Sequence, residues 1–181
     1  MHSISNSRDM GSLSGRICSC TICPLSISRK NAVPGEGPVD ATIMLVGEAP
    51  GRDEDQLGRP FAGRAGAVLS RSLEAAGIDR QALFITNVVK CRPPENRRPL
   101  ASEIQACLPY LHRQMELVQP RIVCLLGNVP CNALLGCEGV TKMRGRLYQD
   151  RYFVTFHPAA VLRNRNLEML LISDFRQIAS L

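Results

Sequence analysis

The chain has 181 residues, 45% of them apolar, which is the size and composition of one globular domain with a full hydrophobic core. Its longest apolar runs span about six residues, whereas a membrane-crossing helix needs roughly 20, and the N-terminal residues lack the apolar stretch of an export signal. We therefore expect a cytoplasmic protein without a membrane segment. The net charge of +6 is compatible with a polyanionic partner such as nucleic acid.

The N-terminal part of the chain divides into a polar stretch and a cysteine-rich segment. Residues 1–16 are rich in Ser, Gly and Asn without periodicity, so we expect a flexible arm ahead of a single domain over residues 17–181. Eight cysteines are many for a reducing compartment, so some should ligate metal or act as reactive thiols. Cys20 and Cys23 form a C-x-x-C, which can bring two thiolates to one metal. Two unrelated loop cysteines are the alternative.

Short apolar runs alternate with amphipathic stretches along the rest of the chain. Continuous runs with β-branched residues predict buried strands, and segments 142–148 and 151–156 are strand-like around a turn; the buried runs are 41–46, 82–86 and 121–126. Between and after them, apolar residues at helical spacing predict amphipathic helices. The alternation predicts an α/β fold, a three-layer α/β/α sandwich with a central, mostly parallel four-stranded sheet.

Polar residues stand where several of these strands end. Gly47 and Glu48 follow the first strand, Asn87 ends the second, and His157 follows the last. A single Asn or His at such a position is more often a helix cap or a turn residue. Because open α/β sheets bind ligands at the carboxyl ends of their strands, the coincidence favours a functional site at this edge.

The chain resembles the family 4 uracil-DNA glycosylases in long motifs that follow the family's order from about Cys20 to Asn164. These motifs are CTICPLSISRKNAVPGEG, VGEAPGRDEDQLGRPFAGRAG, ITNVVKCRPPENRRP and FHPAAVLRN, with Cys107 between the last two. The resemblance implies a [4Fe-4S] cluster bound by Cys20, Cys23, Cys91 and Cys107, whose spacing supplies four thiolates for a cubane. Because hydrolysis transfers no electrons, we expect the cluster to be structural.

The resemblance also implies a uracil pocket. Phe61 would stack on the flipped base, and Asn87 would bind its Watson–Crick edge through an amide that both donates and accepts. His157 would donate to a uracil carbonyl oxygen, where negative charge grows as the glycosidic bond breaks, and backbone amides after Gly47 would add donors.

Three further positions in the second motif are assigned by the same resemblance. Glu48 is the candidate to orient or activate water against the oxocarbenium-like sugar. Glu54 would wall off the space next to C5, where thymine carries a methyl group. Ala49, also expected at the substrate, stands where family 1 enzymes have an aspartate, so a strong general base is not evident.

Basic residues flank the expected pocket on two sides and would contact phosphates in a salt-sensitive, sequence-independent way. They are Lys90, Arg92, Arg97, Arg98, Arg163 and Arg165. Val161 and Leu162 would wedge into the gap left by the base. Solvated loops are the alternative for the arginines.

The function implied is that of a DNA repair hydrolase. The enzyme, acting as a monomer on single- or double-stranded DNA, would flip uracil out, hydrolyse its N-glycosidic bond and leave an abasic site. Two alternatives stay open. One is a non-catalytic uracil- or DNA-binding protein of the same fold, and the other is a four-cysteine zinc module on a nucleotide-binding α/β domain.

Overall fold

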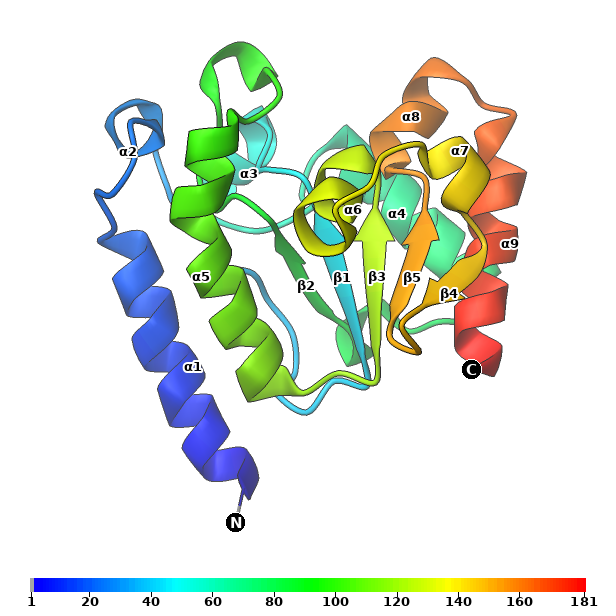
Figure 1. The fold of residues 1–181 in the computed structure, drawn as a ribbon, viewed down its shortest axis with the longest axis horizontal. Coiled ribbons are helices and arrows are strands. Elements are labelled where there is room, and N and C mark those ends of the chain that lie inside the picture. Colours follow the sequence, from blue (N-terminus) through cyan, green and yellow to red (C-terminus); the bar gives the residue numbers. More distant parts are fainter. Residues whose placement is uncertain (1) are drawn as a thin grey trace.

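The computed structural model describes residues 2–181, which are built around one sheet with the strand order β2-β1-β3-β5-β4 (Figure 1). The strands are β1 (Ile43–Gly47), β2 (Phe84–Asn87), β3 (Ile122–Leu126), β4 (Arg146–Tyr148) and β5 (Tyr152–Thr155). Neighbours from β2 to β5 are parallel, and β4 is antiparallel to β5. The mostly parallel α/β sheet is confirmed.

The sheet has five strands rather than the expected four. The fifth is the antiparallel edge strand β4, which holds only three residues. The segment expected as one strand, 142–148, is divided because Val140–Met143 forms the short helix α7 and Gly145 adopts a positive φ of 70° before β4 begins. An antiparallel edge strand on a parallel sheet is a common addition in α/β folds.

Helices cover both faces of the sheet, as Figure 1 shows. They are α1 (His2–Cys18), α2 (Leu25–Ser28), α3 (Arg52–Leu57), α4 (Arg64–Ala75), α5 (Ala101–Val118), α6 (Asn128–Leu135), α7 (Val140–Met143), α8 (Pro158–Arg163) and α9 (Leu167–Ser180), with 3-10 turns η1 (Arg80–Ala82) and η2 (Pro94–Asn96). Successive strand residues point to opposite faces. Met44 and Val46 of β1 pack with α1, α5 and α6, whereas Leu45 packs with α4 and α9.

The N-terminal residues do not form the flexible arm expected from their composition. They form α1, which lies along α5 in Figure 1. Met10, Leu13 and Ile17 are buried, and Asn6 Nδ2 donates to the carbonyl oxygen of Leu117 at 3.0 Å. The spacing of three and four residues places these apolar side chains on one helix face. The polar composition concealed this narrow stripe.

Within residues 2–181, no helix has both the length and the apolar character needed to cross a membrane.

Candidate active site

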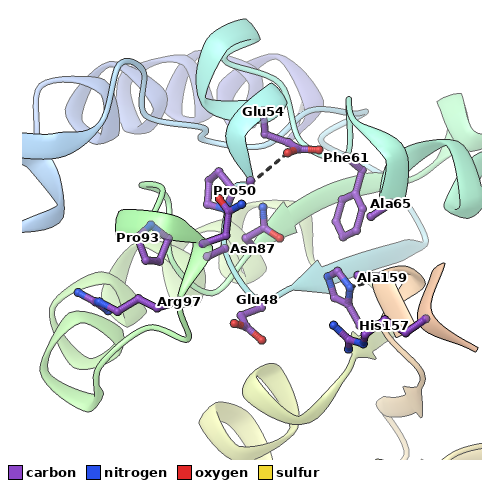
Figure 2. Close-up of a pocket in the computed structure, with 14 residues that line it drawn as sticks. Glu48, Pro50, Glu54, Phe61, Ala65, Asn87, Pro93, Arg97, His157 and Ala159 are labelled. Carbon is purple, nitrogen blue, oxygen red and sulfur yellow. Dashed lines mark hydrogen bonds between the residues drawn. The ribbon is translucent and has the colours of Figure 1, made fainter. Parts of the chain in front are cut away.

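A cavity of about 380 Å³ opens at the carboxyl edge of the sheet, within the range of small-molecule sites (Figure 2). The structure brings together here the three polar residues expected from the strand ends, Glu48, Asn87 and His157. Glu54, in the first turn of α3, and Phe61, from the loop between α3 and α4, also line it. The carboxyl ends of parallel strands share one edge of a sheet, so residues far apart in sequence meet at this point.

Asn87 lies at the floor of this cavity as the last residue of β2, in register with Gly47 of β1. Its side chain is buried, and Oδ1 has no hydrogen-bond partner within the described part of the chain. A buried acceptor without a partner is costly and rare in folded proteins. Because this oxygen belongs to a residue that lines the cavity, the arrangement fits a ligand that supplies the missing donor.

Gly47 keeps the space beside Asn87 open. A Cβ added at this position would overlap Asn87 Oδ1 and would lie 2.7 Å from Cζ of Phe61. Any larger residue would therefore displace the amide, the ring or both. The glycine is required here by the close approach of two side chains, not by its backbone dihedrals.

Phe61 and His157 form the aromatic part of the cavity. Their ring centroids are 5.6 Å apart with an interplanar angle of 31°, and Figure 2 shows both rings lining the same space. Phe61 is buried although its backbone adopts φ of +49°, in the left-handed region. Non-glycine residues in that region cost free energy and cluster at functional sites.

His157 precedes α8 as its N-cap residue, and its Nδ1 accepts a hydrogen bond of 3.1 Å from the backbone N–H of Ala159. Burial, and secondarily the positive charge of Arg163, lower the pKa of His157 to about 4. The imidazole is therefore neutral at neutral pH. Because Nδ1 is occupied as an acceptor, the ring proton resides on Nε2, which is a hydrogen-bond donor.

The two glutamates of the cavity differ in their surroundings. Burial raises the pKa of Glu48 above its usual value, an effect that Arg98 and Arg163 partly oppose. Glu54 instead uses both carboxylate oxygens on the backbone, accepting from Gly51 N at 3.1 Å and from Gly63 N at 2.9 Å. Glu54 thus ties the start of α3 to the start of α4 and forms a fixed wall of the cavity. Ala49 lines the same cavity.

The four cysteines expected as ligands line a second, smaller cavity between α1, α5 and the loop after β2. Cys20 and Cys23 come from the N-terminal segment, and Cys91 and Cys107 from the segment that follows Asn87. No set of three or more His, Cys, Asp or Glu side chains among residues 2–181 is arranged to hold a single metal ion.

Arg29 is a residue of this second cavity that sequence reasoning missed. Its Nη1 donates to Cys91 Sγ at 2.9 Å, and its Nη2 donates to the carbonyl oxygens of Cys18 and Cys20 at 2.8 and 2.9 Å. Burial raises the pKa of the Cys91 thiol, and the positive charge of Arg29 partly opposes this effect by favouring the thiolate. Arg29 lies in the same motif as Cys20 and Cys23, CTICPLSISRKNAVPGEG, but within that motif only the cysteines were expected to have a role.

Lys90 does not face solvent, which corrects its expected role at phosphate. Its side chain is only 1% exposed, and Nζ donates to Thr86 Oγ1 at 2.7 Å, to the carbonyl oxygen of Asn87 at 2.6 Å and to Gln114 Oε1 at 2.6 Å. Burial lowers the pKa of Lys90 to about 7. The sequence places it among basic residues, but the strand end turns its side chain inward, where it holds the peptide of Asn87.

The arginines expected at DNA lie around the mouth of the first cavity. Arg97 and Arg163 line it, and Arg92 and Arg165 are on the surface. Three of these side chains are already engaged, and one of them is Arg92, whose Nε donates to Asn96 Oδ1 at 2.7 Å. Arg97 forms a two-pronged ion pair with Glu103 at 2.7 and 2.9 Å, and Arg98 pairs with Glu138 at 2.6 Å.

Comparison with known proteins places this geometry in one family. The family model described as the uracil DNA glycosylase superfamily matches residues 34–177. A type-4 uracil-DNA glycosylase of Sulfurisphaera tokodaii is 47% identical over 91% of this chain and 81% of its own length. Type-4 enzymes of Thermotoga maritima and Archaeoglobus fulgidus are 41% and 40% identical, covering 93% and 91% of this chain and 92% and 89% of theirs. The chain therefore belongs to the uracil DNA glycosylase superfamily, within its type-4 branch.

Proposed function

We infer that this protein is a DNA repair glycosylase that releases free uracil from DNA and leaves an abasic site. The observation that carries this inference is the buried, unpartnered Oδ1 of Asn87 at the floor of a cavity walled by Phe61 and a neutral His157. Uracil presents an N3–H donor beside the O4 acceptor, which matches a carboxamide that accepts and donates. Cytosine presents a lone pair at N3 and is mismatched. A base that is stacked and paired in duplex DNA cannot enter the cavity at the sheet edge, so the nucleotide must be flipped out of the helix.

The proposed chemistry places negative charge on the departing uracil. As the glycosidic bond breaks, charge accumulates on the ring and its O2 oxygen, and the Nε2–H of neutral His157 donates toward it. A preorganised donor of this kind contributes about 3 kcal/mol, or roughly a hundredfold in rate. The N3–H and O4 contacts of Asn87 hold the ring in place. Water adds a hydroxyl group to C1′, and its second proton neutralises the uracil anion.

We assign Glu48 to the sugar side of this reaction. It follows β1 directly and lines the cavity, and its charged form balances an oxocarbenium-like sugar. Its pKa is raised mainly by burial, which makes the carboxylate a better acceptor for a proton of the attacking water. Glu54, held by two backbone N–H groups, is the wall that excludes the methyl group of thymine, with Ala49 beside it.

We also propose that Cys20, Cys23, Cys91 and Cys107 hold a [4Fe-4S] cluster. The support is that all four line one cavity and that Arg29 places a positive charge against Cys91 Sγ. The bound cluster supplies a cross-link between the N-terminal segment and the loop after Asn87, not an electron for hydrolysis. A brown protein with broad visible absorption and iron supports this assignment, whereas a colourless protein with bound zinc contradicts it.

DNA binding is proposed for the arginines around the cavity, chiefly the exposed Arg163 and Arg165. Arg92, Arg97 and Arg98 would exchange their protein partners for phosphates. Binding should then weaken steeply with salt. We propose that the protein acts as a monomer. None of the eight cysteines, all within residues 2–181, forms a disulfide, which supports a reducing, cytoplasmic compartment.

The test is release of free uracil from labelled oligonucleotides carrying U:G, U:A, single-stranded U and T:G. We expect multiple-turnover release from the uracil substrates and none from T:G. Tight binding without release would instead support a non-catalytic uracil sensor of the same fold. Asn87→Ala serves as the matched control, because it removes the base contact without reaching the cysteine cavity.

A further inference from the structure

The backbone of Phe61 needs an external constraint. Its φ of +49° lies in the left-handed region, where a side chain crowds the following carbonyl and costs about 1–2 kcal/mol. Its ring must nevertheless keep one orientation to line the cavity at 5.6 Å from the His157 ring. A residue in such a conformation persists only where the surrounding structure determines it.

One side of this constraint is steric. Gly66, in the first turn of α4, lies so close to Phe61 that an added Cβ would overlap the Phe61 carbonyl oxygen. The helix therefore closes off one direction in which the Phe61 peptide could relax. Steric contact does not by itself fix the direction of the Phe61 carbonyl group, which also requires a hydrogen-bond donor.

That electrostatic contact comes from Arg80, in the 3-10 turn η1 just ahead of β2. Its Nη2 donates to the carbonyl oxygens of Pro60 at 3.1 Å and Phe61 at 3.3 Å, and its Nη1 donates to Ser70 Oγ at 3.1 Å. The guanidinium thus joins two consecutive peptide groups to α4. Its planar, permanently charged fork suits this geometry, and no other side chain presents donors in the same way.

A carboxylate fixes the arginine in turn. Arg80 Nη2 lies 3.5 Å from Glu36 Oε1, and the backbone of Glu36 exchanges hydrogen bonds of 2.8 and 3.0 Å with Ile85 of β2. Arg59 pairs with the same carboxylate at 2.8 Å, but its side chain is 70% exposed, against 24% for Arg80. The two arginines share one acid, and only Arg80 bonds to the Phe61 peptide.

We propose that Arg80 is a positioning residue that holds Phe61 in the orientation required for base stacking and thereby sets the affinity of the pocket for uracil. The proposal rests on the stacking role of Phe61 in the proposed function. Arg80 touches neither base nor sugar, and acts by holding the carbonyl groups of Pro60 and Phe61. Because stacking requires an aligned ring face, release of this peptide lowers the affinity without removing the ring.

The test compares Arg80→Met with the matched control Arg59→Met, each purified with its iron–sulfur cluster. Inhibition by free uracil measures affinity for the base, and kcat/KM on single-stranded uracil DNA measures excision. Base–aromatic stacking corresponds to about five- to tenfold, so the uracil inhibition constant should rise by that factor in Arg80→Met and stay within twofold in Arg59→Met. An unchanged constant in Arg80→Met, even with a lower melting temperature, overturns the proposal.

A double-mutant cycle with Phe61→Ala separates positioning from general stability. If Arg80 acts through the Phe61 ring, Arg80→Met adds no further loss of uracil affinity once that ring is gone. Independent losses that multiply in the double variant contradict the proposal. If Phe61→Ala alone leaves the uracil inhibition constant unchanged, the stacking role of Phe61 is itself wrong, and this inference falls with it. Iron content and melting temperature are recorded for all variants.

Discussion

Gly47→Ala should close the base pocket without otherwise altering the fold. Gly47 lies at the end of β1, and its added Cβ would overlap Asn87 Oδ1 and stand 2.7 Å from Phe61 Cζ, closer than the 3.0 Å that real Cβ contacts respect. Either the amide or the ring must move. Loss of the amide contact costs about 1–3 kcal/mol and loss of stacking about 0.5–1.5 kcal/mol. Together they amount to about 1.5–4.5 kcal/mol, which lowers kcat/KM by roughly 10- to 2000-fold.

The assay is single-turnover excision of uracil from single-stranded and U:G oligonucleotides, with thermal unfolding and iron content measured in parallel. Overpacking of this kind costs about 1–3 kcal/mol, so a modest fall in melting temperature is expected. Gly15→Ala is the control, because its added Cβ meets nothing within 4 Å and lies in α1, where alanine favours the helix. If Gly47→Ala keeps kcat/KM within about threefold of the parent, the base does not sit against Asn87 and Phe61.

Further predictions concern the histidine, the cysteine cavity and the buried lysine. His157→Ala should lower the excision rate about a hundredfold or more, and the parent kcat/KM should show no ionisation of this histidine between pH 5 and 8, because burial lowers its pKa to about 4. In the unfolded chain this histidine has a pKa near 6.5, so between about pH 4 and 6.5 the unfolded state binds more protons than the folded state. The free energy of unfolding therefore falls as the pH falls through that window, which urea unfolding at several pH values measures. An ionisation near pH 6.5 in the pH–rate profile would contradict the low pKa of His157. Cys91→Ala should lose iron and melting temperature first and activity only through them, so loss of all excision at an unchanged melting temperature would exclude a structural role. Lys90→Met removes the Nζ donor from the carbonyl oxygen of Asn87, while Gln114 Oε1 still accepts from Thr86 Oγ1. The free energy of unfolding should therefore fall by about 1–3 kcal/mol in thermal and urea unfolding, and unchanged stability would show that the hydrogen bonds of this lysine contribute nothing.

The strands and the polar residues at their ends were predictable because each depends on short stretches of chain. Continuous apolar runs located β1, β2 and β3, and a parallel sheet brings their carboxyl ends to one edge whatever the loops do. Asn87 and His157 were assigned to a site on that ground alone. The resemblance of the motifs then added their chemistry. Long motifs in a fixed order indicate this chemistry because their site residues have fixed places around the ligand.

The errors arose where the outcome depended on distant partners. Composition suggested a flexible arm for residues 1–16, yet Met10, Leu13 and Ile17 find a surface to cover on α5. Lys90 stands in a basic stretch of sequence, but its ammonium group is enclosed by Thr86 and Gln114. In both cases a local average of polarity failed because burial is decided by what packs against the residue.

The sequence by itself determined the α/β class, the sheet edge that carries the site and the residue types that meet there, because hydrophobic period and strand order act locally. Tertiary structure alone decided the unpartnered state of Asn87 Oδ1, the low pKa of His157 and the hold of Arg80 on the Phe61 peptide. Each of these depends on the removal of water and on contacts between segments about 20 or more residues apart in sequence. Desolvation and approach distance are properties of the packed molecule, and no pattern along the chain encodes them.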